Sequence, residues 1–280
     1  MNTPEANRAD LNSLLTIAIQ AALLAGAEIL KIYESGFSVA YKKDKSPLTE
    51  ADQNAHLCIS SVLAPTGIPL LSEEGNPIPY KERKDLDRLW IVDPLDGTKE
   101  FIQKNGEFTV NIALIQNQKA VLGVIYQPTE RLLYFASEKG AFKIENCPSS
   151  GSKADEWITH LNKAQKLPLR QTRKTLAVAV SRSHQGKETA LFIETLQARQ
   201  PGLVLVSAGS SLKFCLLAEG TADLYPRFGP TNEWDTAAGQ AILEQAGGEV
   251  IDSKTEKPML YNREVILNNS FLARAKLPVE

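Results

Sequence analysis

The stretch that decides the fold lies at residues 90–101 and reads Trp90-Ile91-Val92-Asp93-Pro94-Leu95-Asp96-Gly97-Thr98-Lys99-Glu100-Phe101. Its apolar start predicts a strand. Pro94 has no amide hydrogen and a fixed φ, so strand pairing is expected to stop near Asp93. Asp96-Gly97 then supplies turn chemistry. Two carboxylates are thus held close together, beside the hydroxyl of Thr98.

This pair of carboxylates favours a metal site. Like charges at short range repel unless a cation lies between them, and oxygen donors with a nearby hydroxyl suit Mg²⁺ better than zinc. The same residues are also typical of an Asp-Pro and Asp-Gly surface turn. The stretch alone leaves both interpretations open.

The composition is that of an ordinary globular protein. The 280 residues are 43% hydrophobic and 23% charged, with a formal net charge of −2, and this length favours about two domains or one large one. Without a basic surplus, no footprint for a nucleic acid polymer is expected, whereas a local basic pocket for one small anion is compatible with these values. A small phosphorylated ligand fits better than a polymer.

Cysteines and histidines are too scattered to build a disulfide framework or a histidine-rich metal cluster. The cysteines stand at positions 58, 147 and 215 and the histidines at positions 56, 160 and 184, which is typical of a reducing cytosol and leaves carboxylates as the expected metal ligands. Residues 1–10 are polar and acidic, unlike a signal peptide, and no apolar stretch is expected to reach the ~18 residues of a membrane span. We therefore expect a cytoplasmic protein without a transmembrane segment.

The first half of the chain predicts helices on a sheet. Apolar residues recur at helical spacing over 10–33, and Thr49, three residues before Asp52, predicts the N-cap of a second helix that runs to residue 63. Short apolar runs at 69–72 and 89–92 predict strands with acids at their ends, and β-rich runs at 109–115, 121–126 and 132–136 predict antiparallel hairpins.

The second half alternates strands and helices, as in an α/β unit. Strands are expected at 176–180, 203–206, 250–251 and 265–267, and helices at 188–198, 211–218 and 234–245. The polar stretch 147–173 is the expected junction. We predict two subdomains: residues 1–150, an α+β unit with most of the metal ligands, and residues 151–280, an α/β unit with Asp235 and the ligand pocket.

Four acids are candidates for one metal-binding cleft. Glu73, Asp93 and Asp96 lie at strand ends, and Asp235 lies in the first turn of a helix, where negative charge is favourable. A site for two ions ~3.5–4 Å apart needs one bridging carboxylate and a separate carboxylate for each ion, and Asp93 is the natural bridge. Singly, Glu73 also suits a solvated strand end and Asp235 an ordinary helix acid. Only the combination favours metal.

Four segments, in order and spacing, resemble the inositol monophosphatase superfamily of Mg²⁺-dependent, lithium-sensitive phosphatases. They are residues 45–52 (Lys-Ser-Pro-Leu-Thr-Glu-Ala-Asp), 72–74 (Ser-Glu-Glu), 90–101 and 234–239 (Trp-Asp-Thr-Ala-Ala-Gly). Lys99-Glu100-Phe101 with residues 209–215 and 225–230 resembles the CysQ branch of 3′(2′),5′-bisphosphate nucleotidases. The resemblance implies an α/β (α+β) fold, the layered αβαβα sandwich of the inositol monophosphatase and fructose-1,6-bisphosphatase type. It also implies hydrolysis of adenosine 3′,5′-bisphosphate to AMP and phosphate, a step of sulfur metabolism.

The same resemblance implies roles for individual residues. Glu73, Asp93 and the carbonyl of Leu95 would hold one Mg²⁺ and Asp93, Asp96 and Asp235 a second, among two or three ions in all. Thr98 would orient the attacking water, and Asp52 would receive its proton through the threonine hydroxyl, although Thr49 and Asp52 by themselves are typical of a helix cap. The expected catalytic residues are Asp52, Glu73 and Thr98. The expected substrate-binding residues near the metal site are Glu73, Leu95, Asp96, Gly97, Thr98 and Asp235, with the amides of Gly97 and Thr98 on the scissile phosphate.

Recognition of the rest of the substrate is expected from the second half. Ser181 and His184 follow a predicted strand, where α/β sheets commonly bind ligands, and resemble nucleotide contacts of the branch. Gly209 and Lys213 resemble another such pair, with Lys213 as a point charge for the phosphate that is not cleaved. Arg227 is a weaker candidate. The structural alternatives are a turn histidine and a solvated lysine.

Other functions would use part of this set. An inositol or sugar monophosphatase with the same metal core is the closest rival, and Lys99-Glu100 together with residues 209–213 counts against it. A noncatalytic phosphate sensor would not need Thr98 and Asp52 beside the acids. The residues do not choose between adenosine 3′,5′-bisphosphate and 3′-phosphoadenylyl sulfate. They also leave open the oligomeric state and a peripheral association with the cytoplasmic face of the inner membrane.

Overall fold

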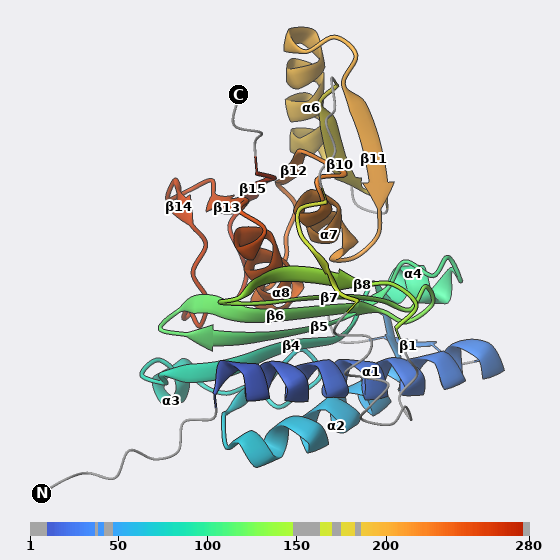
Figure 1. The fold of residues 1–280 in the computed structure, drawn as a ribbon, viewed down its shortest axis with the longest axis vertical. Coiled ribbons are helices and arrows are strands. Elements are labelled where there is room, and N and C mark those ends of the chain that lie inside the picture. The colour runs from blue at the N-terminus through green and yellow to red at the C-terminus, as the bar shows by residue number, and fades with distance from the viewer. Residues whose placement is uncertain are drawn as a thin grey trace, which may run out of the picture.

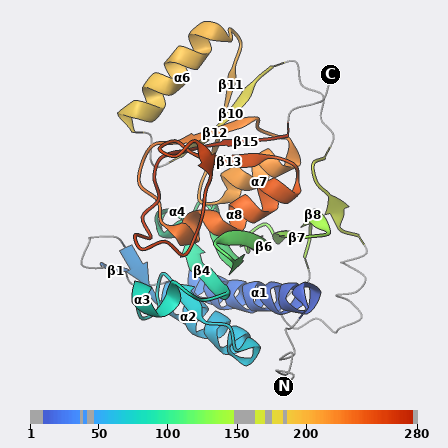
Figure 2. The same cartoon turned by 90° about the vertical axis from the view of Figure 1, so that its left-hand side faces the viewer.

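Five layers of helices and sheets alternate in this protein. The computed structural model describes residues 10–36, 39–41, 47–147, 163–169, 175–182 and 186–276. From the bottom of Figure 1 upward the layers are α1 (Leu11–Ser35) with α2 (Glu50–Leu63), a seven-stranded sheet, α7 (Leu212–Glu219) with α8 (Glu233–Gln245), a six-stranded sheet, and α6 (Lys187–Arg199). Figure 2 shows the same order from the side. The expected αβαβα sandwich is confirmed.

The first sheet has the strand order β3-β4-β5-β6-β7-β8-β9. The strands are β3 (Leu70–Ser72), β4 (Arg88–Asp96), β5 (Thr109–Gln116), β6 (Lys119–Gln127), β7 (Leu132–Ser137), β8 (Gly140–Ile144) and β9 (Gln165–Lys166). β3 pairs in parallel with β4, and all later neighbours are antiparallel. The predicted hairpins are confirmed, whereas β8 and β9 were not expected from the sequence.

β4 departs from the expectation that pairing stops near Asp93. The strand continues to Asp96, and a register shift separates the pair Asp93–Asn111 from the pair Asp96–Thr109. Because Pro94 cannot donate to the ladder, one extra residue is accommodated as a bulge and pairing then resumes. The bulge bends the strand and aims both acids at the same end of the sheet.

The long helix α1 lies on one face of this sheet. Its fully buried positions include Leu14, Ala18, Ala22 and Ile29, and its neighbours are α2, β5 and β6. Within the described residues α1 is long and apolar enough to cross a membrane by length and composition, so the expectation that no such stretch exists was wrong. Half of its most apolar window is buried, which is the burial expected of a core helix.

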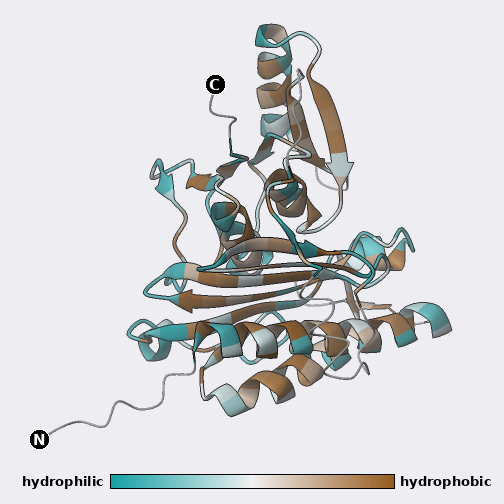
Figure 3. Ribbon diagram, in the orientation of Figure 1, coloured by the Kyte–Doolittle hydropathy of each residue, from teal (hydrophilic) through white to brown (hydrophobic). Residues whose placement is uncertain are grey.

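The opposite face of the sheet is covered by α8. A Cβ atom on Gly123 of β6 would lie 2.4 Å from the carbonyl oxygen of Ala238, so glycine is what allows the helix to approach this closely. One hydrophobic cluster joins Ile91, Ala113 and Ile125 of the sheet to Ile242 of α8. In Figure 3 the apolar residues follow the strands of this sheet and the helix faces turned toward it. The core therefore crosses the expected junction.

The second sheet has the order β11-β10-β12-β15-β13-β14. Its strands are β10 (Ala177–Ser181), β11 (Val204–Ala208), β12 (Leu224–Arg227), β13 (Glu249–Asp252), β14 (Lys257–Pro258) and β15 (Phe271–Arg274). β10 is parallel to β11 and β12, and the other pairs are antiparallel. The strand expected at 265–267 is wrong, because this segment contributes a single bridge between Leu267 and Asn232.

Five short elements complete the described part of the chain. They are β1 (Val39–Tyr41), β2 (Pro47–Thr49), the 3-10 turn η1 (Ala64–Thr66), α3 (Tyr80–Arg83) and α4 (Thr98–Ile102). α4 begins directly after β4 and contacts β2. The segment 90–101 is therefore a strand, a bulge and the first turn of a helix.

Candidate active site

Three of the four candidate acids meet at one point. Glu73, Asp93 and Asp235 each offer a carboxylate oxygen, and these oxygens lie within 4.8 Å of one another. Ser72 pairs with Val92 in the parallel ladder, and the amide of Glu73 donates to the carbonyl of Val92 at 3.1 Å, so Glu73 is placed beside Asp93. α8 brings Asp235 from the other side of the sheet.

The electrostatics of this cluster call for a cation. Burial, followed by repulsion from Glu73 and Asp96, raises the pKa of Asp93 well above its ordinary value, and burial and the same neighbours raise the pKa of Asp235. Asp93 is 2% exposed. Buried carboxylates are costly in charged form, and several carboxylate oxygens this close together fit a hard divalent ion.

Asp96 lies beside the three-carboxylate cluster and has its own hydrogen bonds. Its Oδ2 accepts from Oγ of Ser211 at 2.7 Å and from Nδ2 of Asn111 at 3.3 Å. Burial nevertheless raises its pKa. Oγ of Ser211 also lies 3.0 Å from the carbonyl oxygen of Asp235, so Ser211 links Asp96 to the start of α8. Sequence reasoning missed Ser211 and Asn111, which have no distinguishing spacing.

The turn after β4 is fixed by backbone geometry. The amide of Leu95 donates to Oδ1 of Asp93 at 3.1 Å. Gly97 has φ of 92° in the left-handed region, and a Cβ there would lie 3.2 Å from the carbonyl oxygen of Glu107 and from Cβ of Ser210. Glycine is therefore required by both conformation and space. α4 begins at Thr98, directly after this turn.

Asp52 divides its two oxygens between two partners. Oδ2 accepts from the amide of Thr49 at 2.7 Å and from its hydroxyl at 2.6 Å, which completes a capping box at the start of α2. Oδ1 accepts from the hydroxyl of Thr98 at 3.3 Å. Asp52 is 2% exposed. The cap predicted from the sequence and the contact with Thr98 thus coexist.

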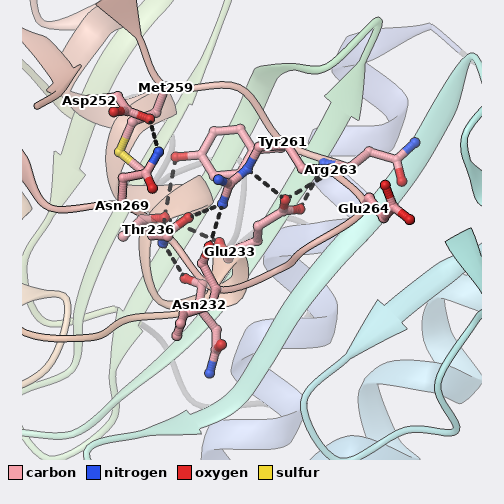
Figure 4. A network of polar contacts seen from close by, with 12 residues as sticks. Asn232, Glu233, Thr236, Asp252, Met259, Tyr261, Arg263, Glu264 and Asn269 are labelled. Atoms are coloured by element: carbon pink, nitrogen blue, oxygen red, sulfur yellow. Dashed lines mark hydrogen bonds and ion pairs between the residues drawn. The ribbon is translucent and has the colours of Figure 1, made fainter. Parts of the chain in front are cut away.

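A buried polar network holds the start of α8, and Figure 4 shows its members. Glu233 is fully buried and accepts from the amides of Asn262 at 2.7 Å and Arg263 at 3.0 Å, as well as from Nε of Arg263. Asn268 donates to the carbonyl of Asn232 at 2.7 Å. The amide of Asn232 in turn donates to Asp235 at 2.8 Å. The network was missed, and its one sequence signal is the acid directly before Trp234.

A cleft of about 690 Å³ extends from the acids into the second half of the molecule. Its lining includes Glu73, Asp93, Leu95, Asp96, Gly97, Thr98 and Asp235 on one side and Ser181, Ser210, Lys213 and Arg227 on the other. Gly209 is placed next to this lining, and its amide donates to Glu107 at 2.8 Å. His184 lies outside the described residues.

Two basic side chains reach the cleft with donor atoms that are withdrawn from solvent. Lys213 is 3% exposed and donates to the carbonyls of Ala208 and Ser210, and burial lowers its pKa to about 8. Arg227 donates to the carbonyl of Pro230 at 3.0 Å, while its Nε is buried without a hydrogen-bond partner in the described part of the chain. Donors in this state favour an anionic ligand.

Three features together define a metal-dependent phosphatase. They are a cluster of carboxylates around the buried Asp93 that fits a cation, a hydroxyl held against a further carboxylate, and a cleft with basic side chains. The comparisons agree with this class: residues 10–277 match the model of the inositol monophosphatase family. The chain belongs to this family, so it is a phosphatase that acts on a small phosphate ester.

Curated relatives match over almost the whole chain. The 3′(2′),5′-bisphosphate nucleotidases CysQ of Salmonella typhimurium and Escherichia coli K12 are each 44% identical to it, over 92% of this chain and 98% of theirs. Among solved structures, CysQ from Bacteroides thetaiotaomicron is 47% identical, with a TM-score of 0.85 over 95% of this chain and 98% of that one. The suhB protein of Bartonella henselae, at 25% identity, has a TM-score of 0.72 over 94% of each chain.

Proposed function

We propose that this protein is a Mg²⁺-dependent 3′(2′),5′-bisphosphate nucleotidase that hydrolyses adenosine 3′,5′-bisphosphate to AMP and phosphate. One observation carries the proposal: a single cleft joins the acid cluster to the buried side chain of Lys213 and to Arg227. A substrate with two phosphates can therefore place one at the acids and the other at the basic side chains. The names of the relatives that are 44% identical over most of the chain support the same activity.

The acids are expected to hold Mg²⁺ in two main positions. Glu73, Asp93 and the carbonyl of Leu95 would hold one ion, and Asp93, Asp96 and Asp235 the second, with two or three ions in all. When bound, Mg²⁺ lowers the pKa of a water molecule and neutralises the charge of the phosphate. The family's sensitivity to Li⁺ is expected here for the same reason, since Li⁺ would compete at these carboxylates.

The chain's own groups would align the attacking water. The hydroxyl of Thr98 already contacts Oδ1 of Asp52, so a water that donates to Thr98 can pass its proton along this pair. The backbone of Gly97 and Thr98 starts α4 and presents amide hydrogens toward the scissile phosphate. The leaving group is then the 3′ oxygen of the sugar.

The second phosphate and the nucleoside would bind across the cleft. Lys213 keeps one N–H beyond its two bonds to backbone carbonyls, and Arg227 offers its buried Nε. Ser181 lines the same side, and His184 is proposed as a further nucleotide contact from the sequence. Gly209 is proposed to act through the shape of its turn, because its amide is bound to Glu107.

Two broader features belong to the proposal. Residues 1–150 and 151–280 are proposed as subdomains that meet at the cleft, and the protein is proposed to work in the cytoplasm. An inositol or sugar monophosphatase remains the competing function, because it would use the same acids. It would not need a positively charged side chain as buried as that of Lys213, which is 3% exposed.

Phosphate release from a panel of esters tests the function. Adenosine 3′,5′-bisphosphate, 3′-AMP, 5′-AMP, inositol 1-phosphate and fructose 1,6-bisphosphate are each assayed with Mg²⁺, with EDTA, and with Mg²⁺ plus Li⁺. We expect the highest kcat/KM for the bisphosphate nucleotide, no turnover in EDTA, and inhibition by Li⁺. A higher kcat/KM for inositol 1-phosphate or fructose 1,6-bisphosphate would replace the proposal by the competing function.

A further inference from the structure

We propose that Glu107 is a positioning residue that sets the distance between the turn at Gly97 and the basic side chain of Lys213, and thereby the preference for a substrate with two phosphates. This inference rests on the proposed function. It concerns a residue that is neither an expected metal ligand nor part of the described lining of the cleft.

The segment Ala208-Gly209-Ser210 is a strained turn with several anchors. Ser210 has φ of 41°, in the left-handed region that a side chain rarely adopts. Such a conformation persists where its surroundings impose it. Here the hydroxyl of Ser210 lies 3.1 Å from that of Thr109, and Nζ of Lys213 donates to the carbonyls of Ala208 and Ser210. Lys213 is thus part of the turn that it anchors.

Glu107 supplies the remaining anchor of this turn. Its Oε2 accepts from the amide of Gly209 at 2.8 Å and from Nε of Arg182 at 2.7 Å, and its Oε1 accepts from Nη2 of Arg182 at 2.6 Å. Although partial burial opposes the shift, the hydrogen bonds from Arg182 and Gly209 lower the pKa of Glu107, so the carboxylate stays charged at neutral pH. The side chain of Glu107 therefore links the residue that follows β10 to the residue that follows β11.

The loop that carries Glu107 is itself fixed to the first sheet. The carbonyl of Gly106 accepts from Nε2 of Gln127 at 3.0 Å and from the hydroxyl of Thr129 at 2.8 Å. Gln127 is the last residue of β6 and Thr129 lies just beyond it. The loop therefore cannot move together with the second sheet without losing these bonds.

The backbone of Glu107 also lies close to two glycines. A Cβ on Gly97 would lie 3.2 Å from the carbonyl oxygen of Glu107, and a Cβ on Gly209 would lie 2.7 Å from the same atom. The turn expected to bind the scissile phosphate and the turn anchored by Lys213 therefore both pack against the backbone of Glu107. Without the carboxylate, the second turn loses one of its anchors, whereas no bond of the first turn depends on that carboxylate.

The role of Glu107 is tested by comparing the change in KM for two substrates in the same variant. For Glu107→Ala we expect KM for adenosine 3′,5′-bisphosphate to rise about tenfold. This is the effect expected from the loss of a partly exposed group of charge-assisted hydrogen bonds. KM for 3′-AMP, which has the same scissile phosphate but no 5′-phosphate, should rise less than about twofold, with kcat and the Mg²⁺ concentration for half-maximal rate unchanged. Glu107→Gln keeps an oxygen for the amide of Gly209 and should give a smaller rise, about threefold by the same reasoning.

The control is a more exposed ion pair elsewhere in the second half. Glu249 pairs with Arg274 at 3.3 Å, with both side chains nearly half exposed, and Glu249→Gln should leave both KM values unchanged. Equal rises of KM for the two substrates, or a fall in kcat with unchanged KM, would overturn the positioning role while the proposed function stands. A wild-type enzyme with no preference for the bisphosphate over 3′-AMP would overturn both. If Glu107→Ala does not fold, Glu107→Gln decides by the same ratio.

Discussion

The hydroxyl of Thr98 lies 3.3 Å from Oδ1 of Asp52, while Oδ2 of the same carboxylate caps α2 through Thr49. The cap fixes the carboxylate, so Oδ1 is presented to Thr98 without freedom to turn away. One acid therefore serves both the fold and, in our proposal, the transfer of a proton from the attacking water.

Thr98 and Asp52 should act as a unit. We expect Thr98→Ala and Asp52→Asn each to lower kcat on the order of 10²–10⁴-fold, the range of general base catalysis. The double variant should be no slower than the slower single variant, because both remove the same step. Thr98→Ser, which keeps the hydroxyl, should recover most of the rate. If the losses in steady-state kcat add in the double variant, the two residues act in different steps and the prediction is wrong.

Asp96 should be needed for turnover and dispensable for folding. In Asp96→Asn the side chain keeps its size and an oxygen that can accept from Ser211, so the thermal midpoint should move little. Loss of the negative charge should abolish phosphate release. Near-normal activity at saturating Mg²⁺ would contradict the assignment of Asp96 as a metal ligand. Asp252→Asn, far along the chain, removes the same charge and serves as the control for activity.

Metal should stabilise the protein more strongly as pH rises. The pKa values of Asp93 and Asp235 are raised in the folded protein. The folded state therefore binds these protons more tightly than the unfolded state, whose carboxyls titrate near pH ~3.9. Stability of the metal-free protein should fall as pH rises from about 4 through the raised pKa values. Calorimetry in EDTA and in Mg²⁺ at pH 6 and pH 8 should show the larger metal-induced shift of the midpoint at pH 8. An equal shift at both values would contradict the account.

Binding of the second phosphate should weaken above pH 8. Burial lowers the pKa of Lys213 to about 8, so its ammonium is charged below this value and neutral above it. The ratio of KM for the bisphosphate to KM for 3′-AMP should rise between pH 7 and pH 9.5, and the ratio cancels titrations that both substrates share. Lys213→Met, which keeps the length of the side chain, should have a high ratio at every pH. A flat ratio in the wild type would exclude Lys213 from this contact.

The network around Glu233 should act on the metal site through Asp235. Glu233→Gln leaves Arg263 without its buried charge partner and should cost roughly 1–3 kcal/mol of stability. Because the network holds the first turn of α8, the Mg²⁺ concentration for half-maximal rate should also rise. Asp252→Asn removes an acid that accepts from Asn269 at 2.8 Å near β13, and it should change stability alone. If the Mg²⁺ concentration for half-maximal rate is unchanged in Glu233→Gln, the network contributes to folding alone.

Local sequence signals were sufficient for most elements of the fold. The capping pattern of Thr49 and Asp52 placed α2 to within a residue, and the apolar spacing placed α1. The parallel pairing of β3 with β4 brings Glu73 beside Asp93, as expected when acids follow neighbouring strands. These features depend on periodicity and caps, which operate within a few residues of the chain.

Features that depend on distant segments were not accessible in this way. The bulge at Pro94 exists because Thr109 resumes the ladder beyond it. The bonds of Ser211 to Asp96 and of Glu107 to Gly209 join residues about a hundred positions apart. No short-range pattern marks such partners, because each is an ordinary polar residue until the fold brings it to the site.

A competition experiment tests the central claim most directly. Adenosine 3′,5′-bisphosphate and inositol 1-phosphate are mixed at equal concentration with enzyme and Mg²⁺, and both substrates and their products are followed by ³¹P NMR. We predict that the bisphosphate is consumed first, that the 3′-phosphate signal is lost while the 5′-phosphate signal of AMP remains, and that EDTA stops the reaction. Consumption of inositol 1-phosphate ahead of the nucleotide, or release of the 5′-phosphate, would contradict the account.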